Sequence, residues 1–205
     1  GNTMSDSIRV GLIGYGYASK TFHAPLIAGT PGMTLAAVSS SDATKVHADW
    51  PTVPVVSEPK HLFNDPDIDL IVIPTPNDTH FPLAKAALEA AKHVVVDKPF
   101  TVTLSQAREL DALARSSGRL LSVFHNRRWD SDFLTVKALL SEGTLGEIVY
   151  FESHFDRFRP QVRNRWRELA GPGSGIWYDL APHLLDQTVN LFGLPVSMTV
   201  DLAQL

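Results

Sequence analysis

Short, almost wholly apolar runs alternate with amphipathic stretches over roughly the first 123 residues of the chain. The runs are rich in β-branched residues and stop at glycine, proline or polar residues, as buried strands of a parallel sheet do. They predict strands at 8–14, 34–38, 69–73, 93–96 and 120–123, with helices between them at 20–28, 82–91 and 104–116. This alternation is typical of an α/β fold whose doubly wound parallel sheet carries helices on both faces.

The pattern changes after Phe124. It then predicts a helix at 133–140, a partly alternating strand at 148–155, an arginine- and glycine-rich loop at 157–175, an apolar-faced helix at 178–192 and a strand at 196–205. We therefore expect two domains, one at 8–123 and the other at 124–205. The second is interpreted as the first, truncated part of an α+β domain.

Composition narrows the classes of function. Eighteen Lys and Arg stand against 22 Asp and Glu, a net charge of -4 with no long run of either sign, which argues against nucleic-acid or membrane-surface binding. The absence of cysteine excludes disulfides, thiol nucleophiles and Cys-type zinc sites, and no metal site is expected. No apolar run could span a bilayer and no secretion segment is visible, so we expect a cytoplasmic location. Residues 1–7 are interpreted as a cloning remnant and flexible start.

The segment Gly14-Tyr15-Gly16-Tyr17-Ala18-Ser19 lies between a predicted strand and a predicted helix and matches the pattern G-x-G-x-x-[small]. The first glycine permits a tight turn, and the second lets the backbone approach a pyrophosphate. The small third residue lets helix and strand pack closely, and here Ser19 replaces the usual glycine or alanine. An ordinary turn is the alternative, but the surrounding strand–helix units favour a Rossmann-type dinucleotide site.

The end of the second predicted strand bears on the choice of cofactor. NAD sites place an acidic residue there, which binds the ribose hydroxyls. This chain has Ser39-Ser40-Ser41, with Lys45 nearby. Hydroxyls and a lysine can hold a 2'-phosphate and no carboxylate repels it, so the pattern favours NADP over NAD. In the alternative interpretation, Asp42 takes the role of the carboxylate.

Two further groups are candidates for chemistry. Lys98, in Asp97-Lys98-Pro99, follows a predicted buried strand and so stands at the sheet edge where open α/β proteins bind ligands. Asp179 and His183 are spaced i, i+4 and project from one face of a predicted helix. The alternatives are a surface lysine for Lys98 and, for Asp179 and His183, a surface ion pair or a metal ligand pair, the latter disfavoured because the chain has no Cys and no H-E-x-x-H pattern.

Taken in order, these motifs form a set. It comprises the glycine-rich turn, Thr75-Pro76-Asn77 with His80, Asp97-Lys98-Pro99, Asn126-Arg127-Arg128, Trp166-Arg167 and Gly175-x-x-x-Asp179-x-x-x-His183-x-x-Asp186. The set resembles the Gfo/Idh/MocA oxidoreductases, named for glucose-fructose oxidoreductase and inositol dehydrogenase. Segments 124–130 and 157–167 most resemble the NADP-dependent scyllo-inositol dehydrogenase branch. Asp97 departs from the family's usual Glu, and family members continue well beyond residue 205.

The resemblance implies hydride transfer between NADP and a secondary alcohol of an inositol, sugar or polyol. His183, with an ordinary pKa of about 6.5, fits the base, and Lys98 fits the group that stabilises the developing alkoxide. Asp179 would orient His183 or bind substrate. In family terms Thr75, Pro76, Asn77 and His80 would line the nicotinamide ribose, and Trp166 and Arg167 would contact the nicotinamide end. Asp97 is also expected to bind the cofactor, and Asn126 and Arg127 the substrate.

Two rival functions remain open at this point. The first is a non-catalytic dinucleotide-binding sensor or regulator, which would need none of Lys98, Asp179 and His183. The second is a family member that oxidises a sugar transiently in order to cleave or epimerise it. In either case we expect the 205 residues to be part of a longer product. That product would be a homo-oligomer, a dimer or tetramer, with a small-molecule substrate and no nucleic-acid or membrane partner.

Overall fold

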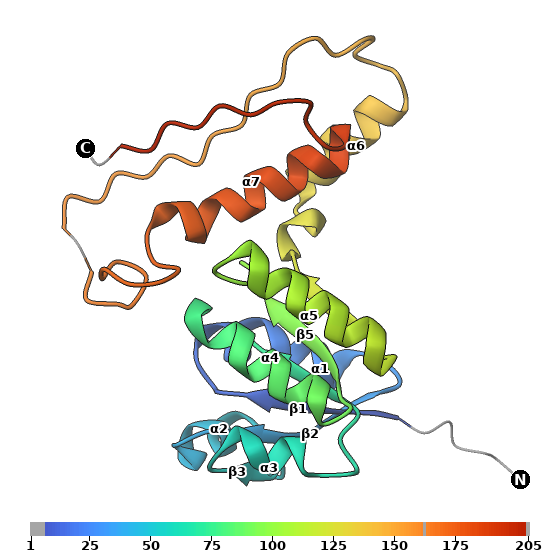
Figure 1. Ribbon diagram of the computed structural model, residues 1–205, viewed down its shortest axis with the longest axis vertical. Helices are drawn as coiled ribbons and strands as arrows, with labels where there is room; N and C mark the ends of the chain where they lie inside the picture. Colours follow the sequence, from blue (N-terminus) through green and yellow to red (C-terminus); the bar gives the residue numbers. More distant parts are fainter. Residues whose placement is uncertain (1–6, 162, 204–205) are drawn as a thin grey trace, which may run out of the picture. The chain divides into compact units, whose positions relative to one another are not determined.

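The computed structural model describes residues 7–161 and 163–203 and divides into two compact units (Figure 1). The first unit ends at Phe124 and also takes in Gly171–Gly173. The second unit begins at His125 and contains the rest of the described chain. The expectation for residues 1–6, and for the last two positions of the strand predicted at 196–205, lies outside the described residues. No described helix is both long and apolar enough to cross a membrane.

The first unit is built on a six-stranded sheet in the order β3-β2-β1-β4-β5-β6, with every pair parallel. Its strands are β1 Ile8–Ile13, β2 Met33–Ser39, β3 Val55–Val56, β4 Leu70–Ile73, β5 His93–Asp97 and β6 Leu121–Phe124. This topology confirms the predicted doubly wound α/β fold. The strand order reverses between β1 and β4, and such a switch point is where open parallel sheets bind ligands.

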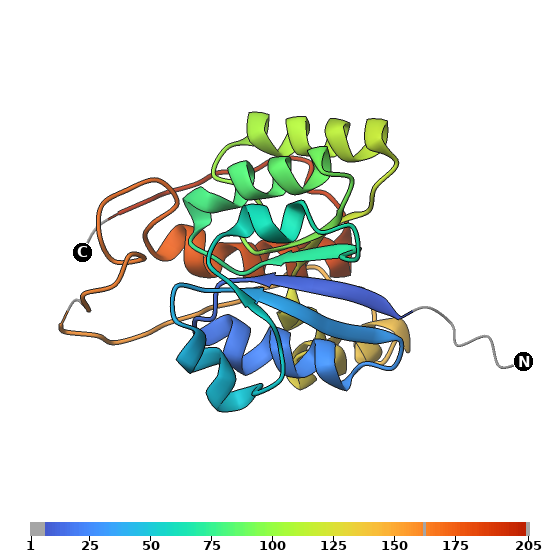
Figure 2. The same ribbon diagram turned by 90° about the horizontal axis from the view of Figure 1, so that it is seen from below.

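Helices cover both faces of this sheet (Figure 2). They are η1 Ser19–His23, α1 Ala24–Gly29, α2 Ala43–Asp49, α3 Pro59–Phe63, η2 Asn77–Thr79, α4 His80–Glu89 and α5 Leu104–Ser117. Side chains of α3, α4 and α5 form one apolar core with Ile71 and Ile73, and those of α1 and α2 form the other with Val72. Because successive strand residues point to opposite faces, the uniformly apolar β4 serves both cores.

Helices are the regular elements of the second unit in the described residues, and long irregular segments connect them. It contains η3 Asn126–Trp129, α6 Ser131–Ser141 and α7 Ile176–Phe192. The strands predicted at 148–155 and 196–205 are wrong for the described residues, where the structure has no strand after Phe124. Alternating hydrophobicity specifies only which side chains share a face, whereas a strand also needs a neighbour for its backbone hydrogen bonds. Without one, apolar side chains such as Val149 and Val196 lie exposed.

Candidate active site

The glycine-rich turn joins β1 to η1 and is held by hydrogen bonds to Ser39 of β2 and to the Ser19 side chain. Gly14 has φ +79°, in the left-handed region that favours glycine, and its N–H donates to the Ser39 carbonyl at 2.6 Å. A Cβ built on Gly16 would meet nothing within 4 Å, so the backbone there borders open space. The buried Ser19 hydroxyl donates to the Gly14 carbonyl at 2.9 Å. The serine that departs from the usual pattern therefore stabilises the turn.

An open cavity of about 350 Å³ lies against this turn and the carboxyl end of β2. It is lined by Ile13, Gly14, Tyr15, Gly16, Ser39, Ser40, Ser41, Asp42, Lys45 and Ser57. Glycine backbone, hydroxyls and one lysine fit the phosphate and ribose groups of a dinucleotide. Asp42 caps α2, because one carboxylate oxygen accepts from the Thr44 N–H at 3.0 Å. The other predicted turn residues differ in exposure: Tyr17 is exposed, whereas Ala18 is half-buried.

The Tyr15 side chain anchors the glycine-rich turn to the end of α2. Its hydroxyl donates to Asp49 at 2.6 Å and accepts from the Trp50 indole N–H at 3.1 Å. Burial, followed by the hydrogen bond to Asp49, raises the pKa of Tyr15 to about 12. The folded protein therefore favours the neutral phenol.

This shift predicts a pH-dependent loss of stability. Because the folded pKa lies above the ordinary value of 10, the stabilisation is fully present below pH 10 and is lost as the pH rises through about 12. We expect a loss of about 2 kcal/mol in the free energy of unfolding across that window. Urea unfolding at stepwise pH should show this slope for the wild type and for Tyr17→Phe, an exposed control. Tyr15→Phe should lose it, and an unchanged slope in that variant would refute the assignment.

The carboxyl ends of β4 and β5 are tied together by His80, which is fully buried. Its Nδ1 lies 2.8 Å from the Pro99 carbonyl oxygen and its Nε2 lies 2.7 Å from that of Thr75. Both ring nitrogens thus face backbone carbonyls, which defines a positioning role for this side chain. A contact between His80 and the cofactor ribose stays a prediction.

The neighbouring turn, Thr75-Pro76-Asn77, is held in a similar way. The Thr75 and Thr79 hydroxyls lie 2.5 Å apart, and the buried Asn77 amide donates to the Gly173 carbonyl at 2.6 Å. Gly173 has φ +73°, and a Cβ there would lie 2.8 Å from the Cβ of Asn77. Gly173 therefore packs on this turn because glycine leaves room for Asn77.

Lys98 follows β5 directly and is half-buried, with a cis peptide bond to Pro99. The preceding residue, Asp97, is fixed by His23, whose Nε2 lies 2.7 Å from the carboxylate Oδ1. His23 is itself buried against the Phe124 ring, with centroids 4.6 Å apart. The backbone of Lys98 is therefore held on one side by His23 and on the other by His80. Sequence reasoning missed His23, since no local pattern marks a partner 74 residues away.

In the second unit, α7 carries Asp179 in its first turn and His183, which is buried, one turn later. Arg167 Nε lies 3.4 Å from Asp179 Oδ1, and the guanidinium stacks on Trp166 at 4.6 Å. The ring centroids of His183 and Phe155 lie 6.5 Å apart. The structure therefore brings these predicted site residues together around the first turns of α7.

The segment that holds Asn126 and Arg127 is fastened to the same helix. Arg128 donates two hydrogen bonds to the Asp186 carboxylate, at 2.8 and 2.6 Å, and this pairing raises the pKa of Arg128. The Gln187 amide donates to the Arg127 carbonyl at 3.1 Å. The Arg127 guanidinium lies 5.2 Å from the centre of the Phe155 ring. Arg128 and Asp186, to which the sequence assigned no catalytic or binding role, thus position η3 on α7.

The predicted site residues therefore form two groups, each within one unit. The first unit holds Gly14, Gly16, Tyr17, Ala18, Ser19, Ser39, Ser40, Ser41, Lys45, Thr75, Pro76, Asn77, His80, Asp97 and Lys98. The second holds Asn126, Arg127, Trp166, Arg167, Asp179 and His183. Across the described residues, no group of three or more His, Asp or Glu could hold a metal ion.

The parallel sheet and its glycine-rich turn define a Rossmann protein that binds a dinucleotide. A model of the oxidoreductase family with an NAD-binding Rossmann fold, GFO_IDH_MocA, matches residues 8–125. A second model, for the GFO/IDH/MocA C-terminal domain, matches residues 133–205. The chain belongs to the Gfo/Idh/MocA family of oxidoreductases.

Individual relatives agree with this membership. The chain is 88% identical over 202 residues to the uncharacterized oxidoreductase YdgJ of Escherichia coli, covering 98% of this chain and 58% of that protein. It is 41% identical over 201 residues to the scyllo-inositol 2-dehydrogenase (NADP(+)) IolW of Bacillus subtilis, covering 98% and 56%. The solved structure of YPO2259 from Yersinia pestis superposes with a TM-score of 0.87 at 74% identity, covering 95% and 55%. The chain thus spans little more than half the length of these relatives.

Proposed function

We propose that the protein is an NADP-preferring dehydrogenase that oxidises a secondary alcohol of an inositol, sugar or polyol. The observation that carries this proposal is the anchoring of Lys98 at the carboxyl end of β5. His23 fixes the residue before it and His80 fixes the carbonyl of the residue after it. A sensor that only bound dinucleotide would have no use for a lysine held in this way.

Each candidate side chain has a distinct task in such a reaction. Bound NADP would supply the acceptor for the hydride of the alcohol carbon. The Lys98 ammonium would stabilise negative charge on the alcohol oxygen, and a ring nitrogen of His183 would take the hydroxyl proton. Asp179, one helical turn from His183, would orient the imidazole or bind a substrate hydroxyl.

Cofactor preference is proposed from the cavity at the end of β2. Ser39, Ser40 and Ser41 line it together with Lys45. Hydroxyl donors and an ammonium suit a 2'-phosphate, whereas Asp42 is engaged in capping α2. The name of the B. subtilis relative, a dehydrogenase that uses NADP(+), supports the same preference and the same substrate class.

A charge introduced at Ser40 should reverse this preference. We expect wild-type protein to bind NADPH more tightly than NADH, and Ser40→Asp to bind NADH more tightly because its carboxylate repels the 2'-phosphate. Fluorescence titration with each cofactor measures both affinities. Ser40→Asn, which has a similar shape and no charge, is the control and should keep the wild-type order. Equal wild-type affinities for the two cofactors would contradict the role given to the serines.

The reaction itself is tested by supplying NADP with a panel of inositols, sugars and polyols and following the absorbance of the reduced nicotinamide. Net NADPH formation supports the dehydrogenase. Sugar conversion without net NADPH would instead favour transient oxidation, and cofactor binding with no conversion of any substrate would favour the sensor.

A further inference from the structure

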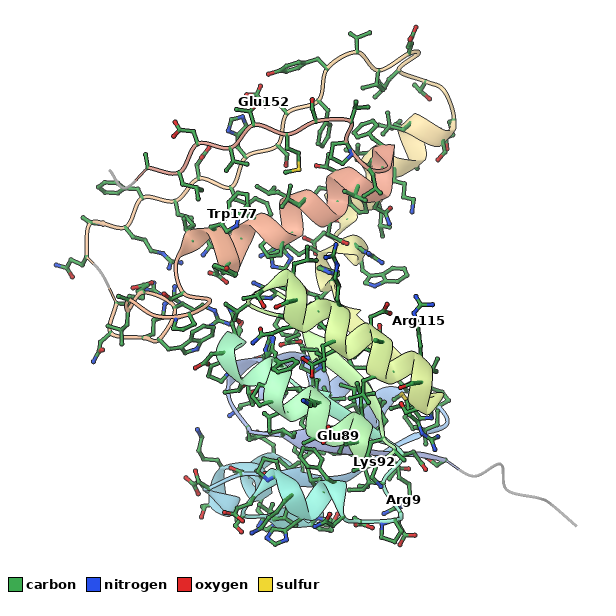
Figure 3. All side chains as sticks on the ribbon, viewed as in Figure 1. Arg9, Glu89, Lys92, Arg115, Glu152 and Trp177 are labelled. Carbon is green, nitrogen blue, oxygen red and sulfur yellow. The ribbon has the colours of Figure 1, made fainter. Side chains whose placement is uncertain are left out.

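A second cavity, of about 200 Å³, lies within the second unit at the start of α7. It is lined by Arg157, Arg159, Arg165, Arg167, Glu168, Gly175, Ile176, Asp179 and Leu180. In Figure 3 this end of α7 is marked by the label on Trp177, in the first turn of the helix. The cavity is smaller than the pockets that enclose whole ligands, and its size suits one small group of a ligand.

The lining holds more cations than its own carboxylates neutralise. Four guanidinium groups face two carboxylates, in a chain whose net charge is -4. Glu168 is shared, with its Oε1 at 2.7 Å from Arg165 and 3.6 Å from Arg159. Asp179 pairs with Arg167. Within the described residues Arg157 makes no ion pair, so positive charge is left over.

The local electrostatics agree with that excess. Burial, and then the like charges of Arg163, Arg157 and Arg165, hold the pKa of Arg159 below its ordinary value. Burial raises the pKa of Glu168, but hydrogen bonds from Arg165 and the Arg163 backbone outweigh it and lower that pKa overall. The carboxylate is already committed to these partners. A further anion would therefore relieve repulsion among the arginines.

The start of α7 adds further donors. Its N-cap is Gly175, which has no side chain to accept from the first backbone N–H groups of this 17-residue helix. Gly175 and Ile176 both line the cavity. The partial positive charge of the helix N-terminus therefore reinforces the arginine cluster.

We propose that this cavity is a subsite for a carboxylate or phosphate group of the substrate, and that the substrate is accordingly an acidic sugar or polyol. This inference rests on the proposed dehydrogenase function. Asp179, in the cavity wall, and His183 lie on one face of α7, separated by about 6 Å along the helix axis. That span is the scale of a small sugar, so an anchored acidic group would place an alcohol near the base.

The test compares acidic ligands with neutral ones of the same skeleton. Calorimetric titration of the protein with gluconate, glucose 6-phosphate, sorbitol and glucose should give at least tenfold tighter binding for one of the acidic probes. Comparing gluconate with glucose 6-phosphate distinguishes a carboxylate from a phosphate. Binding of that probe should weaken as salt is added, because arginine–anion attraction is screened.

The arginines provide the decisive variants. Arg157→Gln and Arg159→Gln should each lower the affinity for the acidic probe about tenfold and leave the affinity for the neutral probes unchanged. Arg115→Gln is the matched control, since Arg115 projects from α5 (Figure 3) and, among the residues that the structure describes, forms its ion pair with Asp111. Thermal unfolding of each variant verifies the fold. Because Arg157 makes no ion pair within the described residues, its replacement should leave the melting temperature unchanged.

Three outcomes separate this proposal from the function on which it rests. Equal affinity for acidic and neutral probes, or acidic binding unaffected by both variants, would overturn the subsite, even if NADP-linked oxidation of a neutral polyol were found. The subsite would also be overturned if the variants lowered the affinity for NADPH and left the affinity for the acidic probes unchanged, because the anion bound there would then be a cofactor phosphate. Arginine-dependent acidic binding without any turnover would support the subsite and overturn the dehydrogenase.

Discussion

Replacing Lys98 by Met, or His183 by Ala, should lower turnover about a hundredfold or more. The methionine keeps much of the length of the lysine but cannot stabilise negative charge on the alcohol oxygen, and alanine cannot take the hydroxyl proton. Affinity for NADPH should change only by a small factor, because the glycine-rich turn and the serine cavity lie elsewhere in the sequence and are untouched. The comparison therefore requires kcat from steady-state kinetics and the NADPH dissociation constant from fluorescence.

Controls must separate lost chemistry from lost structure. Lys85→Met removes a half-buried lysine whose Nζ lies 2.9 Å from Glu109, and it should leave turnover near the wild-type value. His183 is buried, so His183→Gln is included as a variant that leaves a smaller void than alanine. Both His183 variants should flatten the pH dependence of kcat, an effect that misfolding alone does not produce. Near wild-type turnover for Lys98→Met or His183→Ala would remove that residue from the catalytic assignment.

The sheet was predictable from sequence where burial is continuous. β4 and β5 are apolar on both faces, and a run of this kind bounded by proline or polar residues has few alternatives. β3 was missed because its two residues are too few to show a period. Helix α2 lies within the polar segment 39–50, where the hydrophobic periodicity is too weak to predict a helix, and it is specified instead by its cap, Asp42. Local patterns thus define elements well only when the elements are long or fully buried.

The strands predicted in the second unit show the limit of such patterns. The segment at 148–155 alternates well enough to suggest a face, but a ladder depends on another strand in register. Information about a partner strand is not contained in the alternation itself. Hydrophobic periodicity therefore predicted β-strands in segments that form no strand pairing among the described residues.

The candidate site likewise has features that local sequence patterns predict and features that depend on residues far apart in the sequence. Lys98 after a buried strand, and the i, i+4 spacing of Asp179 and His183, are local signals that sequence can supply. The supports of Lys98 are not local, because Asp97 meets His23 across 74 residues. The Asn77 contact with Gly173 spans 96 residues. Such contacts follow from the assembled fold, so sequence reasoning found candidate chemical groups and missed what holds them in place.

His80 is the support whose loss should cost most stability. Replacing it by Ala would leave the Thr75 and Pro99 carbonyls without their partner and open a void at a fully buried position. We expect the free energy of unfolding to fall by about 4 kcal/mol, as measured by urea denaturation. His47→Ala is the control. His47 also meets a backbone carbonyl, that of Val53 at 3.0 Å, but at an exposed site, so its loss should cost about 0.5 kcal/mol or less.

The same replacement also tests whether His80 positions Lys98. If it does, His80→Ala should reduce kcat under conditions where the variant remains folded, because the turn that carries Lys98 loses its link to β4. Affinity for NADPH should fall less than kcat, since the glycine-rich turn is held independently by Ser19 and Ser39. A loss of stability no greater than that of His47→Ala would show that the two carbonyls do not depend on His80. A loss of NADPH affinity larger than the loss of kcat would instead assign His80 to the cofactor, as the family resemblance implies.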